Sequence, residues 1–109
     1  MPKTLKAGEH KLVFTGGVNL KMAHDKKFAK FVVASIIKFN RGDWGDVADE
    51  DWKQNDEALE SLNNSGWYGQ ILGSYLELGF GRTFHIWIIR NTAEEDGTQA
   101  ITVLFPSDY

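Results

Sequence analysis

Carboxylates are the most numerous residues that could do chemistry, and they gather in one short segment. Residues 43–60 contain eight Asp and Glu residues against the single Lys53. Clustered carboxylates can hold a hard cation, but this spacing matches no calcium-loop pattern, and the glycines stand in the wrong places for an EF-hand. Acids in the first turn of a helix are favoured by the helix dipole without any metal. We therefore predict no metal and no cofactor, and we interpret the segment as a charged surface.

The other candidates for catalysis form no recognisable pattern. His10, His24 and His85 are scattered through the chain, and nothing in the spacing sets a carboxylate and a Ser beside any of them. The glycines between 66 and 81 do not lead from a strand into a helix with a following Lys, as a phosphate-binding loop requires. We predict that the protein is not an enzyme, and a small hydrolase is the least favoured alternative.

Basic residues collect in the first part of the chain. Residues 1–42 contain nine Lys and Arg residues against Glu9 and Asp25, whereas the whole chain carries a net charge of −3. Some of the lysines alternate with aromatics: Lys26, Lys27, Phe28, Lys30 and Phe31. The aromatics stand at core spacing and the chain is acidic, so direct nucleic-acid binding is not expected. The asymmetry marks a partner surface, or it reflects two helices of opposite charge packed side by side.

The hydrophobic pattern predicts two helices after a short strand at 11–15. Asp25 is a plausible N-cap of the first helix, which ends at 40–42, where Gly42 can take a positive φ. Its apolar residues recur at helical spacing: Phe28, Phe31, Val32, Ile36 and Phe39. The second helix begins near Asp46 or Asp49 and stops at 63–66. Asn55 lies in its apolar stripe, and a buried Asn without partners costs about 1–3 kcal/mol, so we expect its amide to bind the backbone of the turn at 42–46.

Three strands follow, at 70–78, 83–90 and 99–105, and we predict an antiparallel meander. Leu78 should face Thr83 in the first hairpin, and Ile88 should face Ile101 in the second. One sheet face is then uniformly apolar: Phe84, Ile86, Ile88, Ile101, Val103 and Phe105. A one-residue slip would destroy this face. The predicted fold is α+β, with the two helices packed on one face of a small antiparallel sheet that the short N-terminal strand joins.

The opposite sheet face is too apolar for a fully solvated surface: Leu72, Ser74, Leu76, His85, Trp87, Ile89, Thr102 and Leu104. Such a face is usually covered or used in binding. The cover is the first strand with the N-terminal arm, a second subunit, or a ligand. We favour protein, in cis or as a homodimer. A ligand or a dimer partner would contact Ser74, His85, Trp87 and Thr102.

Length and composition indicate one domain spanning 1–109, with 1–10 as a loose basic arm. There is no Cys, which favours a reducing compartment. No run of apolar residues reaches the length of about 20 that a membrane span needs, and the start lacks an apolar signal region. We expect a protein that stays in the cytoplasm of the cell that makes it.

Three segments together resemble a family of small accessory proteins of bacterial plasmids and phages. They are GDWGD at 42–46 with DEDWKQNDEA at 49–58, IWII at 86–89, and TVLFP at 102–106 followed by Tyr109. The likeness covers about residues 30–109, but the chain departs from it between Arg90 and Ala100, where the family has a tight acidic turn and this chain a longer loop. The resemblance carries over no catalytic residue.

The resemblance implies a setting in which small acidic proteins act on host machinery, as anti-CRISPR proteins do. We therefore expect a non-enzymatic inhibitor of a host defence nuclease complex, whose acidic surface occupies a basic nucleic-acid channel of that protein or ribonucleoprotein. The predicted contact residues are Asp43, Trp44, Asp46, Asp49, Glu50, Asp51, Asp56 and Glu57. The alternative is a small-molecule or nucleotide-binding protein that uses the outer sheet face in a dimer.

Overall fold

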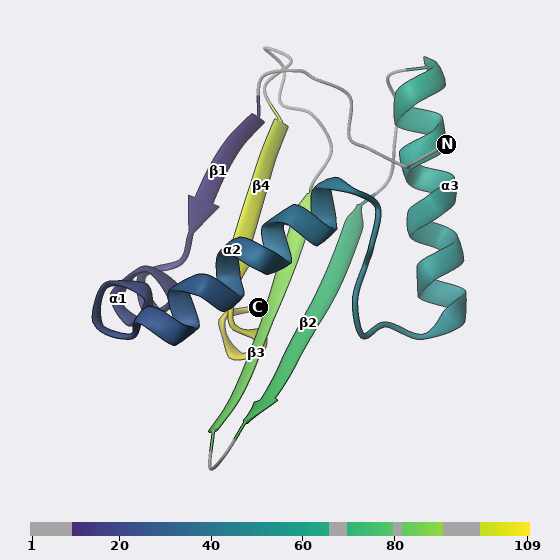
Figure 1. The fold of residues 1–109 in the computed structure, drawn as a ribbon. Coiled ribbons are helices and arrows are strands. Elements are labelled where there is room, and N and C mark those ends of the chain that lie inside the picture. The colour runs from purple at the N-terminus through teal and green to yellow at the C-terminus, as the bar shows by residue number, and fades with distance from the viewer. Residues whose placement is uncertain (1–9, 66–69, 80–81, 91–98) are drawn as a thin grey trace.

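Four strands, three α-helices and a short 3-10 helix make up the described parts of this computed structural model, which are residues 10–65, 70–79, 82–90 and 99–109 (Figure 1). In chain order the elements are β1 (His10–Phe14), α1 (Gly16–His24), α2 (Lys26–Asn40), α3 (Asp49–Ser65), β2 (Ile71–Gly79), β3 (Arg82–Arg90), β4 (Gln99–Leu104) and the 3-10 helix η1 (Pro106–Asp108). The α+β class is confirmed. Within these residues no helix has both the length and the apolar character that crossing a membrane requires.

Helix α2 begins and ends where the sequence predicts. The Asp25 carboxylate accepts hydrogen bonds from the backbone N–H groups of Lys27 and Phe28, each at 3.1 Å, which is the geometry of an N-cap. After Asn40 the chain turns through Gly42, whose φ is 78°. Helix α1 is an addition to the predicted fold. It has only nine residues and buries Val18 alone, so it carries no apolar stripe that periodicity could detect.

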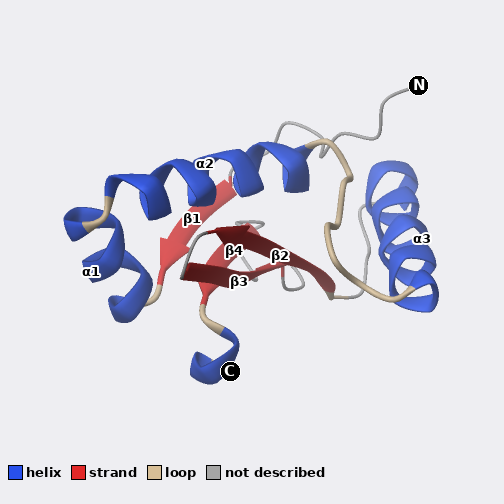
Figure 2. Cartoon of the chain, turned by 60° about the horizontal axis from the view of Figure 1, so that its bottom comes forward, coloured by secondary structure: helices blue, strands red, loops and turns tan. Residues whose placement is uncertain are grey.

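The sheet has the strand order β1-β4-β3-β2. β2, β3 and β4 form the predicted antiparallel meander, but β1 pairs with β4 in parallel, so the prediction of a purely antiparallel sheet is wrong. β4 lies between β3 on one side and β1 on the other. From β1 the chain passes through α1 and α2 across one face of the sheet (Figure 2), and such a crossover is the kind of connection that parallel strands need.

The predicted register is correct in one hairpin and wrong in the other. Leu78 lies opposite Thr83 as expected. In the second hairpin Ile88 lies opposite Val103 rather than Ile101, and Ile101 faces Arg90. A shift of two residues keeps every side chain on its own face, so the predicted apolar face survives, and Arg90 joins it as a buried residue.

Helices α1 and α2 cover that face and complete the core. The fully buried side chains come from both layers: Val18, Phe28, Val32, Phe39, Ile71, Ile86, Ile88 and Val103. The Phe28 ring lies 5.3 Å from that of Phe84 and 5.6 Å from that of Phe105, measured between centroids. Each large ring buries much apolar area, so these aromatic contacts hold α2 against β3 and against the residue that follows β4.

Contrary to our prediction, helix α3 does not pack on the sheet face. It stands along the edge of the sheet beside β2, while α2 crosses the face (Figures 1 and 2). The opposite charges of the two helices are therefore not explained by packing the helices side by side. Among the residues whose side chains are described, α3 buries only Asn55 and Leu59. An apolar stripe this narrow suits a sheet edge better than a sheet face.

Candidate functional site

Asn55 fixes α3 to the edge of β2. Its side-chain Nδ2 donates to the Leu72 carbonyl at 2.7 Å, and its Oδ1 accepts from the Leu72 N–H at 3.2 Å. The amide thus satisfies both backbone groups that a neighbouring strand would otherwise pair. The prediction that Asn55 is buried and binds backbone is confirmed, but the partner is β2 and not the turn at 42–46.

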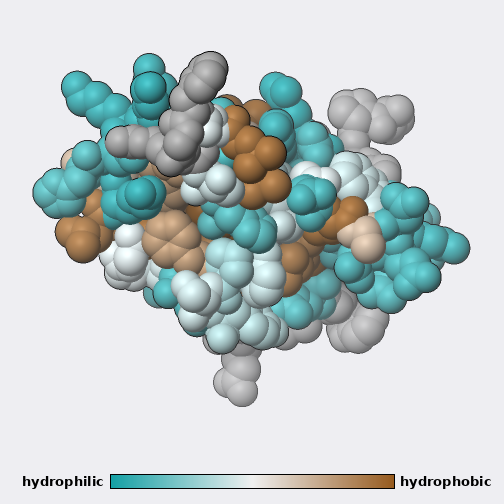
Figure 3. All heavy atoms as spheres, turned by 90° about the horizontal axis from the view of Figure 1, so that it is seen from below, coloured by the Kyte–Doolittle hydropathy of each residue, from teal (hydrophilic) through white to brown (hydrophobic). Residues whose placement is uncertain are grey.

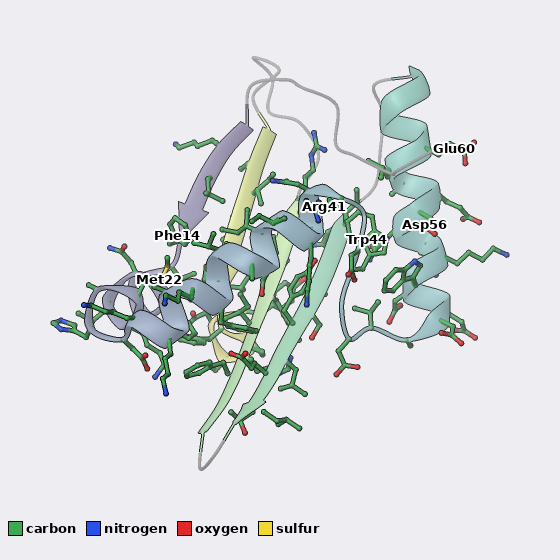
Figure 4. All side chains as sticks on the ribbon, viewed as in Figure 1. Phe14, Met22, Arg41, Trp44, Asp56 and Glu60 are labelled. Atoms are coloured by element: carbon green, nitrogen blue, oxygen red, sulfur yellow. The ribbon has the colours of Figure 1, made fainter. Side chains whose placement is uncertain are left out.

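Trp44 fixes the segment before α3. Its side chain is fully buried, its ring meets Phe39 edge-on at 5.3 Å, and its Nε1 donates to Asp56 Oδ1 at 2.9 Å (Figure 4). Trp44 therefore lies in the core and not on the contact surface that we predicted. Asp56 is half-buried and supports α3 through this hydrogen bond.

The turn between α2 and α3 pairs with β2. The Ser74 N–H donates to the Trp44 carbonyl at 3.0 Å, and the Asp46 N–H donates to the Ser74 carbonyl at 2.6 Å. Gly45 has a φ of 76°, and a Cβ on it would collide with the Ser74 carbonyl. Few residues other than glycine fit this position.

Asp43 closes the same turn through two hydrogen bonds. Its carboxylate accepts from the Gly45 N–H at 3.0 Å, and its carbonyl accepts from the Tyr75 hydroxyl at 2.8 Å. Burial of the Tyr75 phenol, and second to it the nearby Asp43 carboxylate, raise the pKa of Tyr75 above its usual range. Asp43 is half-buried, so it contributes more to the turn than to the surface.

The remaining acids form an exposed surface on α3 and the turn that leads into it, which we call the acidic surface: Asp46, Asp49, Glu50, Asp51, Glu57 and Glu60. In Figure 4 the Glu60 side chain points away from the sheet. Across the described ranges no ion pair joins these acids to a Lys or Arg, and no group of acids and histidines there could hold a metal ion. The surface therefore presents its charge to solvent.

The outer sheet face brings three of its four predicted residues together. Ser74 Oγ lies 2.8 Å from His85 Nε2, and Trp87 lies opposite Ser74 on β3. Thr102 is on β4, opposite Ile89. We did not predict the contact between Ser74 and His85, although the first hairpin register makes them diagonal neighbours, which are within reach across a sheet.

The contact between Ser74 and His85 lacks the other parts of a hydrolytic site. Ser74 is buried, and its backbone N–H and carbonyl both bind the turn at 44–46. Among the residues that the structure describes, no carboxylate makes a hydrogen bond to the His85 ring. A serine nucleophile needs access to substrate and a base that a third group orients, so this geometry does not form a triad.

The chain's own C-terminus covers part of the outer face. The Tyr109 ring meets Trp87 edge-on at 5.6 Å, and Thr15 Oγ1 donates to the Asp108 carboxylate at 2.8 Å, which holds η1 in place. β1 lies within the sheet and not over it, so the prediction that the first strand covers this face is wrong. The N-terminal arm, predicted as further cover, lies outside the described residues apart from residue 10.

Comparison of the chain with protein-family models, with curated proteins and with solved structures finds no match.

Proposed function

We propose that this chain is a non-catalytic binding protein whose acidic surface occupies a basic surface on a partner. The observation that carries the proposal is that six exposed carboxylates, without an ion pair among the described residues, lie on a helix and the turn before it, which the rest of the domain holds in place. Asn55 and Trp44 provide that support. A charged array that is already ordered loses little conformational freedom on binding, and charge complementarity gives specificity and fast association.

The partner that fits this surface is a protein or ribonucleoprotein complex whose basic channel binds nucleic acid. α3 has 17 residues and is therefore about 25 Å long, comparable with about seven base steps of a duplex. Together with the resemblance to accessory proteins of plasmids and phages, this supports inhibition of a host defence nuclease complex as the specific form of the function. Trp44, Asp56 and Asp43 then act as supports, and the exposed acids make the contacts.

Competition with nucleic acid tests the proposal. The protein is immobilised, and a bacterial lysate is passed over it at low salt after nuclease treatment. The retained partner should be released by added duplex DNA or RNA and by salt, because screening weakens contacts between exposed charges. If nothing is retained, or if the retained protein resists both nucleic acid and salt, the acidic surface does not act in this way.

The outer face supports a second candidate, a small-molecule or nucleotide-binding protein. The observation in its favour is the polar contact between Ser74 and His85 beside the aromatic Trp87. Because Tyr109 rests on Trp87, a ligand would have to displace the C-terminus. A panel of nucleotides should raise the melting temperature if this function is right, and a variant that ends at residue 105 should then bind them more tightly.

A further inference from the structure

Only part of the outer edge of β2 is paired. Alternate residues of this strand point their backbone N–H and C=O groups away from β3. The Leu72 groups bind Asn55, and the Ser74 groups bind Trp44 and Asp46. The next residues in the alternation are Leu76 and Leu78. Nothing in the described part of the chain pairs with their outward backbone groups, so the edge of β2 is open at Leu76 and Leu78.

A groove of about 1030 Å³ runs between this open edge and α2. Four exposed lysines of α2 line it: Lys26, Lys27, Lys30 and Lys38. The acids along it are Asp25 and Glu77. The Asp25 carboxylate already caps α2 and lies 4.0 Å from Lys21 Nζ, so the groove presents an excess of positive charge.

The face of β2 that points away from α2 is apolar beside the open edge. Leu76 is 42% and Leu78 is 74% exposed, and the view from below shows hydrophobic side chains exposed among hydrophilic ones at this end of the molecule (Figure 3). An open edge that exposes large apolar residues is a template for pairing with another chain. In a strand added there, side chains would alternate between the two faces of the sheet, one set beside the lysines of α2 and the other beside Leu76 and Leu78.

We propose that the open edge of β2 binds an extended acidic segment of a partner protein, which adds to the sheet as a fifth strand. Main-chain hydrogen bonds to Leu76 and Leu78 hold the segment, as in other cases of β-strand addition. Its acidic side chains face Lys30 and Lys38, and its apolar side chains cover the two leucines. This surface is separate from the acidic surface of α3, so the inference does not depend on the proposed function.

Charge and aromatic content argue against the other occupants. A second copy paired edge to edge would bring both sets of groove lysines onto one face of a continuous sheet, where they would repel each other. Single-stranded nucleic acid binds largely by stacking bases on exposed rings. The two phenylalanine rings in this groove are not open for stacking, because Phe31 is half-buried and Phe84 is buried, which leaves the imidazole of His24 as its one exposed ring.

A labelled peptide tests the inference. The probe is a fluorescein-tagged, acetylated peptide of nine residues that alternates Glu and Val, and its binding to the full chain is measured by fluorescence anisotropy. The same peptide with Lys in place of Glu should not bind. A version N-methylated at the residues that pair with β2 should bind about ten-fold more weakly, because it loses its main-chain hydrogen bonds.

Two charge variants locate the site. Lys30→Glu with Lys38→Glu should weaken binding by about ten-fold or more. Lys11→Glu with Lys53→Glu is the matched control, because it reverses two exposed charges outside the groove, and it should change affinity by less than about two-fold. The melting temperature of each variant shows whether it remains folded.

Hydrogen exchange of the backbone amides gives a reading that charge alone would not change. In the free protein the Leu76 and Leu78 amides should exchange fast, and the acidic peptide should protect them. The inference is wrong if the peptide does not bind at 1 mM, if it binds without protecting these amides, or if both double variants lose affinity equally. A dT12 oligonucleotide that binds more tightly and displaces the peptide would also overturn it, as would a dimer that already protects both amides.

Discussion

The side chain of Asn55 takes the place of a neighbouring strand for Leu72, because it both donates to and accepts from that residue's backbone. Helix α3 is therefore docked on a strand edge by hydrogen bonds as well as by apolar contacts. The acidic surface stands on this helix, so its position relative to the sheet depends on one amide and on the contact between Trp44 and Asp56.

Removing the Asn55 amide should loosen α3 without unfolding the sheet. Asn55→Ala leaves the N–H and carbonyl of Leu72 without their partner, which should lower the free energy of unfolding by about 1–3 kcal/mol. The Leu72 amide should then exchange with solvent much faster than that of Ser74, which keeps its bond to Trp44. Urea unfolding and hydrogen exchange measure the two effects. Gln54→Ala, at an exposed position of the same helix, is the control and should change stability by no more than about 0.5 kcal/mol.

A charge in the core face of the meander should unfold the domain. Val103 is fully buried opposite Ile88, so Val103→Asp places a carboxylate among buried apolar side chains, at a cost comparable with the stability of a small domain. Circular dichroism should show loss of the folded signal at room temperature. The control variant Lys11→Asp, at an exposed position of β1, should remain folded. A Val103→Asp protein that melts like the parent would contradict the burial of this sheet face.

The alternation of residues predicts which face of each strand is buried but does not determine the pairing between strands. In the first hairpin Gly79 pairs with Arg82 at the turn, and this short connection leaves few registers. The second connection, 91–98, is longer, so Ile88 can face Ile101 or Val103 with the same faces buried. The same limit applies to α3, since an acidic helix with a narrow stripe has the same pattern on a face or at an edge.

The candidate site was predictable only in part, for a related reason. Exposed acids in the first turn of α3 follow directly from the sequence. That Trp44 turns inward could not be predicted, because its burial depends on the paired backbone of Gly45 and Ser74. A lone aromatic between acidic residues has the same local pattern on a surface as in a core.

Two glycine substitutions should have opposite effects on stability. Gly45→Ala places a methyl group against the Ser74 carbonyl at a φ of 76°, and it should destabilise the fold by more than about 1 kcal/mol. Gly16 opens α1, and nothing lies within 4 Å of a Cβ added there. Gly16→Ala should therefore be neutral or should stabilise by about 0.4–1 kcal/mol. Thermal unfolding of both variants beside the parent measures the difference, and equal losses would mean that the turn at Gly45 is not formed as described.

Stability should fall in alkaline solution because of Tyr75. Burial raises the pKa of its phenol in the folded state, while in the unfolded chain the pKa is about 10. The folded state therefore holds this proton more tightly, so the stabilisation is complete below pH 10 and is lost as pH rises above that value. Tyr75→Phe should make the decline between pH 10 and 12 less steep, at the cost of the hydrogen bond to the Asp43 carbonyl. Tyr109→Phe, which removes an exposed phenol, is the control, and an unchanged slope for Tyr75→Phe would assign the decline to other groups.

Reversing the acids at the start of α3 should separate folding from function. Asp49, Glu50 and Asp51 are exposed and occupy the first turn of the helix, where each carboxylate contributes roughly 0.3–1 kcal/mol through the helix dipole. Changing all three to Lys should lower the melting temperature but leave the domain folded, because Asn55 and Trp44 still hold α3. Retention of the partner from a lysate should be lost completely, since like charges would then face each other across the interface.

The matched control for this variant reverses three charges of the other sign. Lys26, Lys27 and Lys30 changed to Glu alter the α2 side of the groove and leave the acidic surface intact, so retention of the partner should persist. Because the triple Lys variant of α3 keeps the β2 edge, it should still bind the alternating Glu and Val peptide. If the lysine reversal abolishes partner retention while the acid reversal preserves it, the partner binds along α2, and the function proposed for the acidic surface is wrong.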